Sequence, residues 1–148
     1  MPSPPDDVGY NKAAIVERSL RRAFEEYRSD PSLADWTHID ALTLNIERAC
    51  QAVIDLAFHV VAKDRLGMPQ TSADAFSLMA RAGYIDASVT KGMVAMTGFR
   101  NIAVHEYQAL DLSVLRAIVD GRWRSLADFL TALGYRIEPE TGSGTDRV

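Results

Sequence analysis

Apolar residues recur every three or four positions through most of the chain, which is the period of an α-helix that buries one face. The first such stripe covers about 10–27 and stops at the Asp-Pro-Ser turn over 30–32. The second begins near Asp35 or Thr37, either of which can cap a helix, and continues to Gly67. Its apolar positions keep the helical period without a fault: Ile39, Leu42, Ile46, Ala49, Val53, Leu56 and Val60.

Three further helices are expected after Gly67. The third covers about 72–82 with Ser72 as its N-cap, the fourth starts at Asp86, and the fifth covers about 111–133. No segment shows a convincing strand pattern. Because long amphipathic helices cannot bury their stripes alone, the pattern predicts an all-α, up-and-down bundle of about five helices.

The length of 148 residues favours one domain over 1–148, with loose tails over 1–8 and 138–148, where proline, glycine and polar residues collect. Apolar residues make up 47% of the chain and charged residues 24%, the balance of a globular protein. We find neither a signal peptide nor an apolar run long enough to cross a membrane, so we expect a cytoplasmic protein.

The net charge of −4 disfavours a general nucleic-acid coat, although it permits a nuclease that binds a few phosphates with a local cluster. The single cysteine, Cys50, allows no disulfide within the chain and reads as a small core residue. The carboxylates Glu47, Asp55 and Asp64 do not converge on a helical wheel. We therefore expect no metal site and no cofactor.

The segment over 100–107 brings together side chains suited to cleaving a phosphodiester. His105 follows Arg100 by five positions and precedes Tyr107 by two. An imidazole can move protons near neutral pH, and a guanidinium stabilises the charge of the transition state. Asn101 adds an amide that can orient a phosphate or the imidazole. The same residues also fit a structural role, with Arg100 paired to a carboxylate such as Glu106.

The spacing within this segment has a geometric consequence. On one ideal helix, Arg100 and Tyr107 fall within about 20° of each other, whereas His105 lies about 140° from Arg100. Either the helix ends or kinks between Arg100 and His105, or two copies of the segment meet across an interface. The second alternative predicts a dimer with a shared cleft.

Other candidates carry weaker signals. Arg18, Arg21 and Arg22 occupy one sector of the first helix and can guide RNA phosphates, although a solvated face beside Glu25 and Glu26 explains them better. His38 lies near a helix start, where we expect it to be solvated, and His59 lies near a helix end. We expect neither histidine to carry the chemistry.

Residues 99–107, Phe-Arg-Asn-Ile-Ala-Val-His-Glu-Tyr, resemble the Arg-x4-His-x-Tyr motif of the HepT-type HEPN toxins. The resemblance extends to residues 47–59, to Gly-Met-Pro over 67–69 and to residues 76–83, and it covers about 10–120 in order.

This resemblance implies a HEPN bundle that dimerises and cleaves RNA without a metal at the dimer cleft. Arg100 and His105 would be the catalytic pair, with Asn101 supporting them. The protein would be the toxin of a type II/VII-like pair. An MNT-type nucleotidyltransferase antitoxin would silence it by transferring AMP to Tyr107. The alternative is a non-catalytic HEPN module that binds a nucleotide or a protein.

Overall fold

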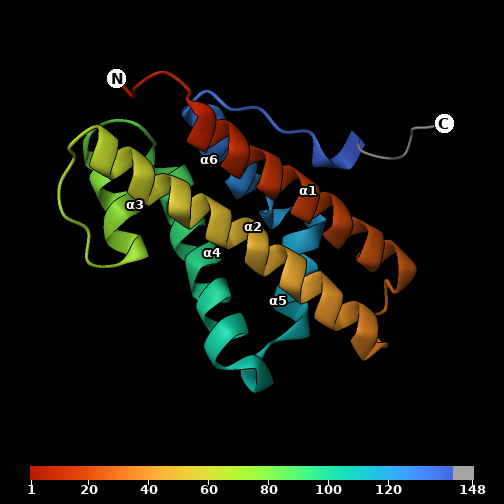
Figure 1. Ribbon diagram of the computed structural model, residues 1–148. Coiled ribbons are helices and arrows are strands. Elements are labelled where there is room, and N and C mark those ends of the chain that lie inside the picture. The colour runs from red at the N-terminus through yellow and green to blue at the C-terminus, as the bar shows by residue number, and fades with distance from the viewer. Residues whose placement is uncertain (142–148) are drawn as a thin grey trace.

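Two long antiparallel helices, α1 (Asp7–Ser29) and α2 (Trp36–Lys63), run side by side in the computed structural model, which describes residues 1–141 (Figure 1). Asp35 begins α2 as an N-cap, because its side chain accepts a hydrogen bond from the Thr37 backbone N–H at 2.9 Å. Of the two caps that the sequence allowed, the structure uses Asp35. The stripe predicted for this helix is buried from Ile39 to Leu56.

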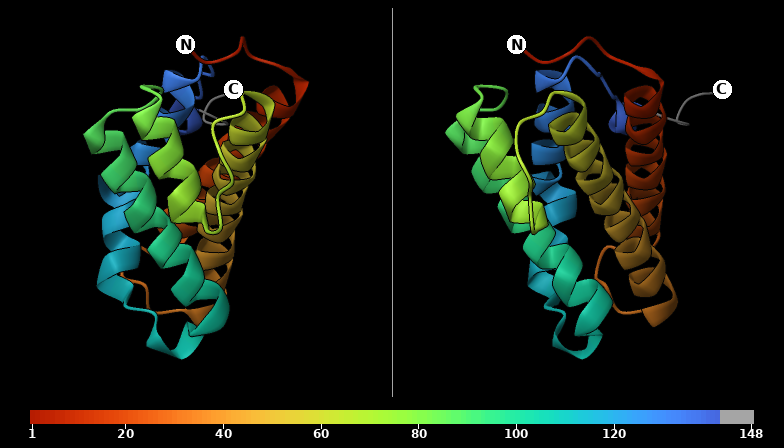
Figure 2. Two further views of the ribbon diagram at one scale, coloured as in Figure 1. Left: turned by 90° about the vertical axis from the view of Figure 1, so that its left-hand side faces the viewer. Right: turned by 60° about the vertical axis from the view of Figure 1, so that its left-hand side comes forward.

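On the other side of α2 lie α3 (Ser72–Arg81) and α4 (Ala87–His105), as both views in Figure 2 show. Thr71, not Ser72, caps α3. The Thr71 hydroxyl accepts a hydrogen bond from the Asp74 backbone N–H, and the Asp74 carboxylate accepts one from the Thr71 backbone N–H. This reciprocal capping box satisfies two exposed donors at once, so it prevails over a cap at Ser72. Asp86 caps α4, as the sequence predicted.

The fifth predicted helix is divided in the structure. It consists of α5 (Leu112–Ala117), a single wide turn over Ile118–Arg122, and α6 (Arg124–Ala132). Within the wide turn the Trp123 N–H bonds the Ile118 carbonyl at 3.1 Å, five residues back. Both side chains are buried. A regular helix would point residues five apart about 140° away from each other, so the extra residue lets both reach the core.

The core lies where α2 meets the other helices. It includes Cys50, which is buried as expected, and an edge-to-face pair of Phe76 from α3 and Phe129 from α6, with ring centroids 5.5 Å apart. The bundle is therefore all-helical within residues 1–141, with six α-helices where the sequence predicted about five.

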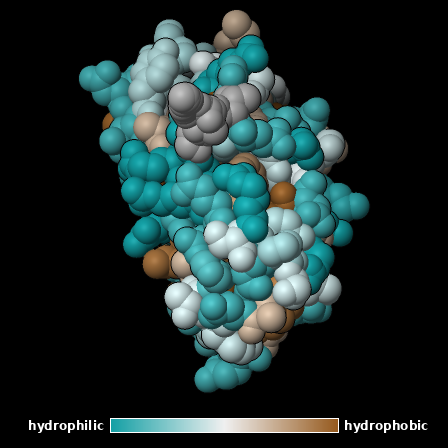
Figure 3. Space-filling view, turned by 90° about the vertical axis from the view of Figure 1, so that its right-hand side faces the viewer, coloured by the Kyte–Doolittle hydropathy of each residue, from teal (hydrophilic) through white to brown (hydrophobic). Residues whose placement is uncertain are grey.

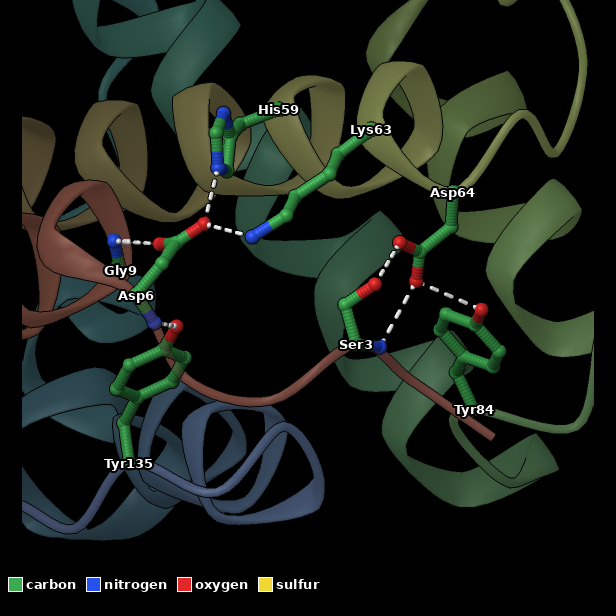
Figure 4. A network of polar contacts seen from close by, with 8 residues as sticks. All are labelled: Ser3, Asp6, Gly9, His59, Lys63, Asp64, Tyr84 and Tyr135. Carbon is green, nitrogen blue, oxygen red and sulfur yellow. Dashed lines mark hydrogen bonds and ion pairs between the residues drawn. The ribbon is translucent and has the colours of Figure 1, made fainter.

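The loose tail expected over residues 1–8 is instead ordered against the ends of α2 and α6. The Ser3 N–H donates to Asp64 at 3.0 Å, and the Asp6 N–H donates to the Tyr135 hydroxyl at 3.0 Å. The Asp6 carboxylate lies 2.8 Å from His59 Nε2 and accepts from Lys63 at 2.7 Å (Figure 4). This arrangement could not be predicted from the sequence, because the residues that bind Ser3 and Asp6 are 53 to 129 positions away along the chain.

At the other end of the chain, residues 138–141 also depart from a loose tail. The Glu138 N–H bonds the Glu17 carboxylate at 2.7 Å, and a short 3₁₀ turn covers Pro139–Thr141. The rest of the tail expected over 138–148 lies outside the described residues.

The surface turned toward the viewer in Figure 3 is mostly hydrophilic, with small and separate hydrophobic patches. In the part of the chain that the structure describes, no helix has the length and apolar character needed to cross a bilayer. Among the same residues, no group of three or more His, Cys, Asp or Glu side chains is placed to hold a metal ion.

Candidate active site on α4

The segment predicted to carry the chemistry lies at the C-terminal end of α4. The helix continues unbroken through Arg100 and Asn101 and ends at His105. It neither ends nor kinks between Arg100 and His105, so the first of the two alternatives left open by the sequence is wrong. The two side chains leave one chain in directions about 140° apart.

Arg100 is half-buried and faces α2. Burial raises the pKa of the Cys50 thiol on α2 to about 12, and the nearby Arg100 charge opposes that shift. Arg100 Nη1 donates to Asn101 Oδ1 at 3.3 Å, while its Nε is buried without a hydrogen-bond partner. Within residues 1–141 the guanidinium forms no ion pair, so the structural role with Glu106 is not observed. A guanidinium whose charge no carboxylate neutralises is suited to bind a phosphate.

His105 differs from the other two histidines in its surroundings. His38 Nδ1 lies 2.7 Å from a Glu26 carboxylate oxygen, and His59 is paired with Asp6. His105 is exposed at the end of α4, and its side chain has no hydrogen-bond or ion-pair partner among the described residues. It is therefore the histidine that is free to exchange a proton with a bound molecule.

Tyr107 does not share the helical face of Arg100, because the chain leaves α4 before it. Glu106 has φ −139° and ψ 51°, and Tyr107 opens a 3₁₀ turn, Tyr107–Ala109. Its hydroxyl donates a hydrogen bond to Asp40 on α2. Burial and the Asp40 carboxylate raise the pKa of Tyr107 to about 12. The angle expected from a helical wheel fails here since a wheel is valid only within a helix.

The arginines predicted to guide RNA lie apart from this site. Arg18, Arg21 and Arg22 belong to α1, and α2 lies between α1 and α4 (Figures 1 and 2). Arg21 donates to the Glu138 carbonyl at 3.4 Å, whereas Arg18 and Arg22 are exposed. Contact of these three with RNA stays a prediction.

Asp40 is the residue of this region that sequence reasoning missed. It lies 67 positions before Tyr107, on the exposed side of α2, where an aspartate is common on any solvated helix. Neither helical periodicity nor motif spacing relates the two residues, so the contact emerges only from the packing of α4 and the following turn against α2.

Comparison with known proteins shows the family to which the chain belongs. The curated mRNA nuclease HepT of Shewanella oneidensis is 33% identical over 129 residues, which cover 86% of this chain and 97% of the relative. A solved tri-AMPylated HEPN toxin of the same organism, in complex with MNT antitoxin, matches with a TM-score of 0.82 and 34% identity, over 87% of this chain and 98% of that one.

A second solved structure, a toxin–antitoxin with AMP-PNP, matches with a TM-score of 0.82 and 32% identity, over 87% of this chain and 99% of the other. The family model described as ribonuclease HepT-like matches residues 15–133. The residues that the family model matches include α4 and the entire candidate site. The chain therefore belongs to the HepT-like ribonuclease family.

Proposed function

We propose that this chain is the toxin of a HEPN/MNT toxin–antitoxin pair and cleaves RNA without a metal ion, with Arg100 and His105 as catalytic residues. One observation carries the proposal: among the described residues no carboxylate pairs with Arg100, and an exposed, unpaired His105 ends the same helix. Together they offer the transition-state cation and the proton-transfer group that phosphodiester cleavage needs. Asn101 positions the guanidinium through its 3.3 Å hydrogen bond.

The complete site is formed by two copies of the chain. Arg100 and His105 point away from each other on one helix, so a second copy is needed to bring both groups to one phosphate. The face of α4 that carries His105 is open to a second copy: Val94 and Ile102 are exposed there, and Gly98 between them leaves open space beside the helix. Residues four apart share one helix face, so the three form a single apolar line.

The partner that we propose is an MNT-type nucleotidyltransferase that silences the toxin by placing AMP on Tyr107. The tri-AMPylated toxin of Shewanella oneidensis in complex with its MNT antitoxin supports this assignment. Tyr107 is 36% exposed, so its hydroxyl lies within reach of another protein. A phosphodiester added there brings a negative charge to the end of the helix that carries Arg100 and His105. One HEPN-like domain over 1–148, acting in the cytoplasm where mRNA is translated, completes the proposal.

An RNA cleavage assay with the purified chain tests the catalytic part. We expect cleavage at equal rates with and without EDTA, and a fall of about 10²- to 10⁴-fold for His105→Ala. His38→Ala is the matched control, because it removes a histidine that pairs with Glu26 outside the site. Cleavage that stops in EDTA and returns with magnesium would contradict metal independence. Equal activity of wild type and His105→Ala would favour the non-catalytic binding module.

A further inference from the structure

The hydroxyl of Tyr107 and the carboxylate of Asp40 form a hydrogen-bonded pair at the surface. Asp40 lies in α2, little more than a turn after the start of that helix, while Tyr107 follows the end of α4. Both residues are exposed, so the pair can be approached by a second protein carrying a nucleotide. No other carboxylate in residues 1–141 accepts a hydrogen bond from this phenol.

A phenol that attacks phosphorus must lose its proton. With the pKa of Tyr107 raised to about 12, only about one molecule in 10⁵ carries a phenolate at pH 7. The proton must therefore leave while the new bond forms, and it needs an acceptor in contact with the oxygen. In protein kinases an aspartate accepts the proton of the attacking hydroxyl, so a carboxylate is basic enough for this role.

We propose that Asp40 is the proton acceptor for AMP transfer to Tyr107, so that the toxin supplies the base for its own silencing. The inference rests on the proposed function. In the reaction the Tyr107 oxygen bonds to the α-phosphorus of ATP, and the bond from that phosphorus to the oxygen bridging to the β-phosphate breaks. Pyrophosphate leaves with the electron pair. The phenol proton passes to Asp40 and from there to water.

The same contact makes the first transfer different from any later one. Once AMP is attached, the tyrosine oxygen has no proton to donate, and the new phosphodiester carries a negative charge beside the Asp40 carboxylate. Like charges repel, so the modified side chain leaves α2. A further AMP added to the attached nucleotide would use a ribose hydroxyl as its acceptor, at a distance from Asp40. Asp40 therefore promotes only the first addition.

The test uses the full-length toxin variant, its cognate MNT antitoxin and ATP, with AMP additions counted by intact mass over time. For Asp40→Asn we expect the first addition to slow by about 10²- to 10⁴-fold at pH 7, because the amide occupies the same place but cannot take the proton. Later additions keep their wild-type rate. Asp120→Asn is the matched control, since Asp120 is an exposed aspartate whose side chain has no partner among the described residues.

A pH profile separates a base from a merely structural residue. In Asp40→Asn solvent must remove the proton, so the first addition should accelerate about tenfold per pH unit from pH 7 to 9. Wild type should change little over the same range. A uniform loss at every pH, or equal rates for Asp40→Asn and wild type, would overturn the role of Asp40. AMP addition to Tyr107→Phe at the wild-type rate would instead overturn the proposed modification site.

Discussion

Arg100 and His105 are five residues apart on the unbroken α4, so their side chains leave the helix about 140° apart and separated by about 7.5 Å along its axis. Arg100 turns toward α2 and is half-buried, whereas His105 is exposed at the helix end. The relationship limits what a single chain can do. It also makes the proposed dimeric site open to a direct genetic test.

Arg100→Ala and His105→Ala are each expected to abolish cleavage when expressed alone. When the two single variants are expressed together, we expect part of the cleavage to return. In a mixed dimer, one site loses both groups and the other keeps the arginine of one copy and the histidine of its partner. With equal expression about half of the dimers are mixed, so about a quarter of wild-type cleavage should return. Co-purified, differently tagged variants allow the measurement. Failure of the mixture to cleave RNA would argue that each site belongs to one chain.

Arg100→Lys is expected to lose most of the activity despite keeping the positive charge. Lysine lacks the planar fork, and it has no Nε at the place where Arg100 keeps a buried donor unpaired. We expect a fall of about 10²- to 10³-fold in the RNA cleavage rate, the usual cost of losing one oriented transition-state donor. Arg116→Lys, which alters an arginine bonded to the Pro31 carbonyl away from the site, should cleave normally.

Tyr107→Phe should remain folded and escape the antitoxin. The change keeps the ring and removes one hydrogen bond at a partly exposed position, which costs about 1 kcal/mol or less. Thermal unfolding measures that cost, and co-expression with the antitoxin measures the escape. If the antitoxin still neutralises the variant and its mass does not change, silencing works by covering the cleft, and the role proposed for Tyr107 is wrong.

Asp6 makes the fold sensitive to acid. Hydrogen bonds from His59 and then Lys63 hold the pKa of the Asp6 carboxyl well below its usual range. A lowered pKa in the folded state means that the stabilisation is present above about pH 4 and is lost as the pH falls below that value.

We therefore expect Asp6→Asn to be less stable than wild type at pH 7, by about 1 kcal/mol or less, and the difference to shrink toward pH 2. Asparagine is also a good N-cap, so the variant isolates the charge from the cap. Urea unfolding at several pH values measures the effect, with the exposed neighbour in Asp7→Asn as control. A constant difference at every pH would show that the charge of Asp6 does not contribute.

The sequence predicted the helices best where a local rule applies. The stripe of α2 and the caps Asp35 and Asp86 depend on residues within one or two turns, and they were placed to within a few positions. The division between α5 and α6 was missed, because nothing local shows that Ile118 and Trp123 must both face the core.

The candidate site likewise has features that could be predicted from neighbouring residues and features that depend on distant ones. Arg100, Asn101 and His105 were found because they are neighbours in the sequence, and the resemblance to a family gave them roles. The surroundings of Arg100 and the partner of Tyr107 depend on α2, which is distant along the chain. Packing between helices decided these features, and a single sequence carries no signal of it.

The N-terminal segment has a consequence for synthesis on the ribosome. The backbone N–H of Asp6 bonds the hydroxyl of Tyr135, which the ribosome adds 129 residues later. The end of the bundle where α1 begins therefore closes only after Tyr135 has left the exit tunnel. A chain released early by a premature stop codon would lack that closure and expose the start of α1 to proteases.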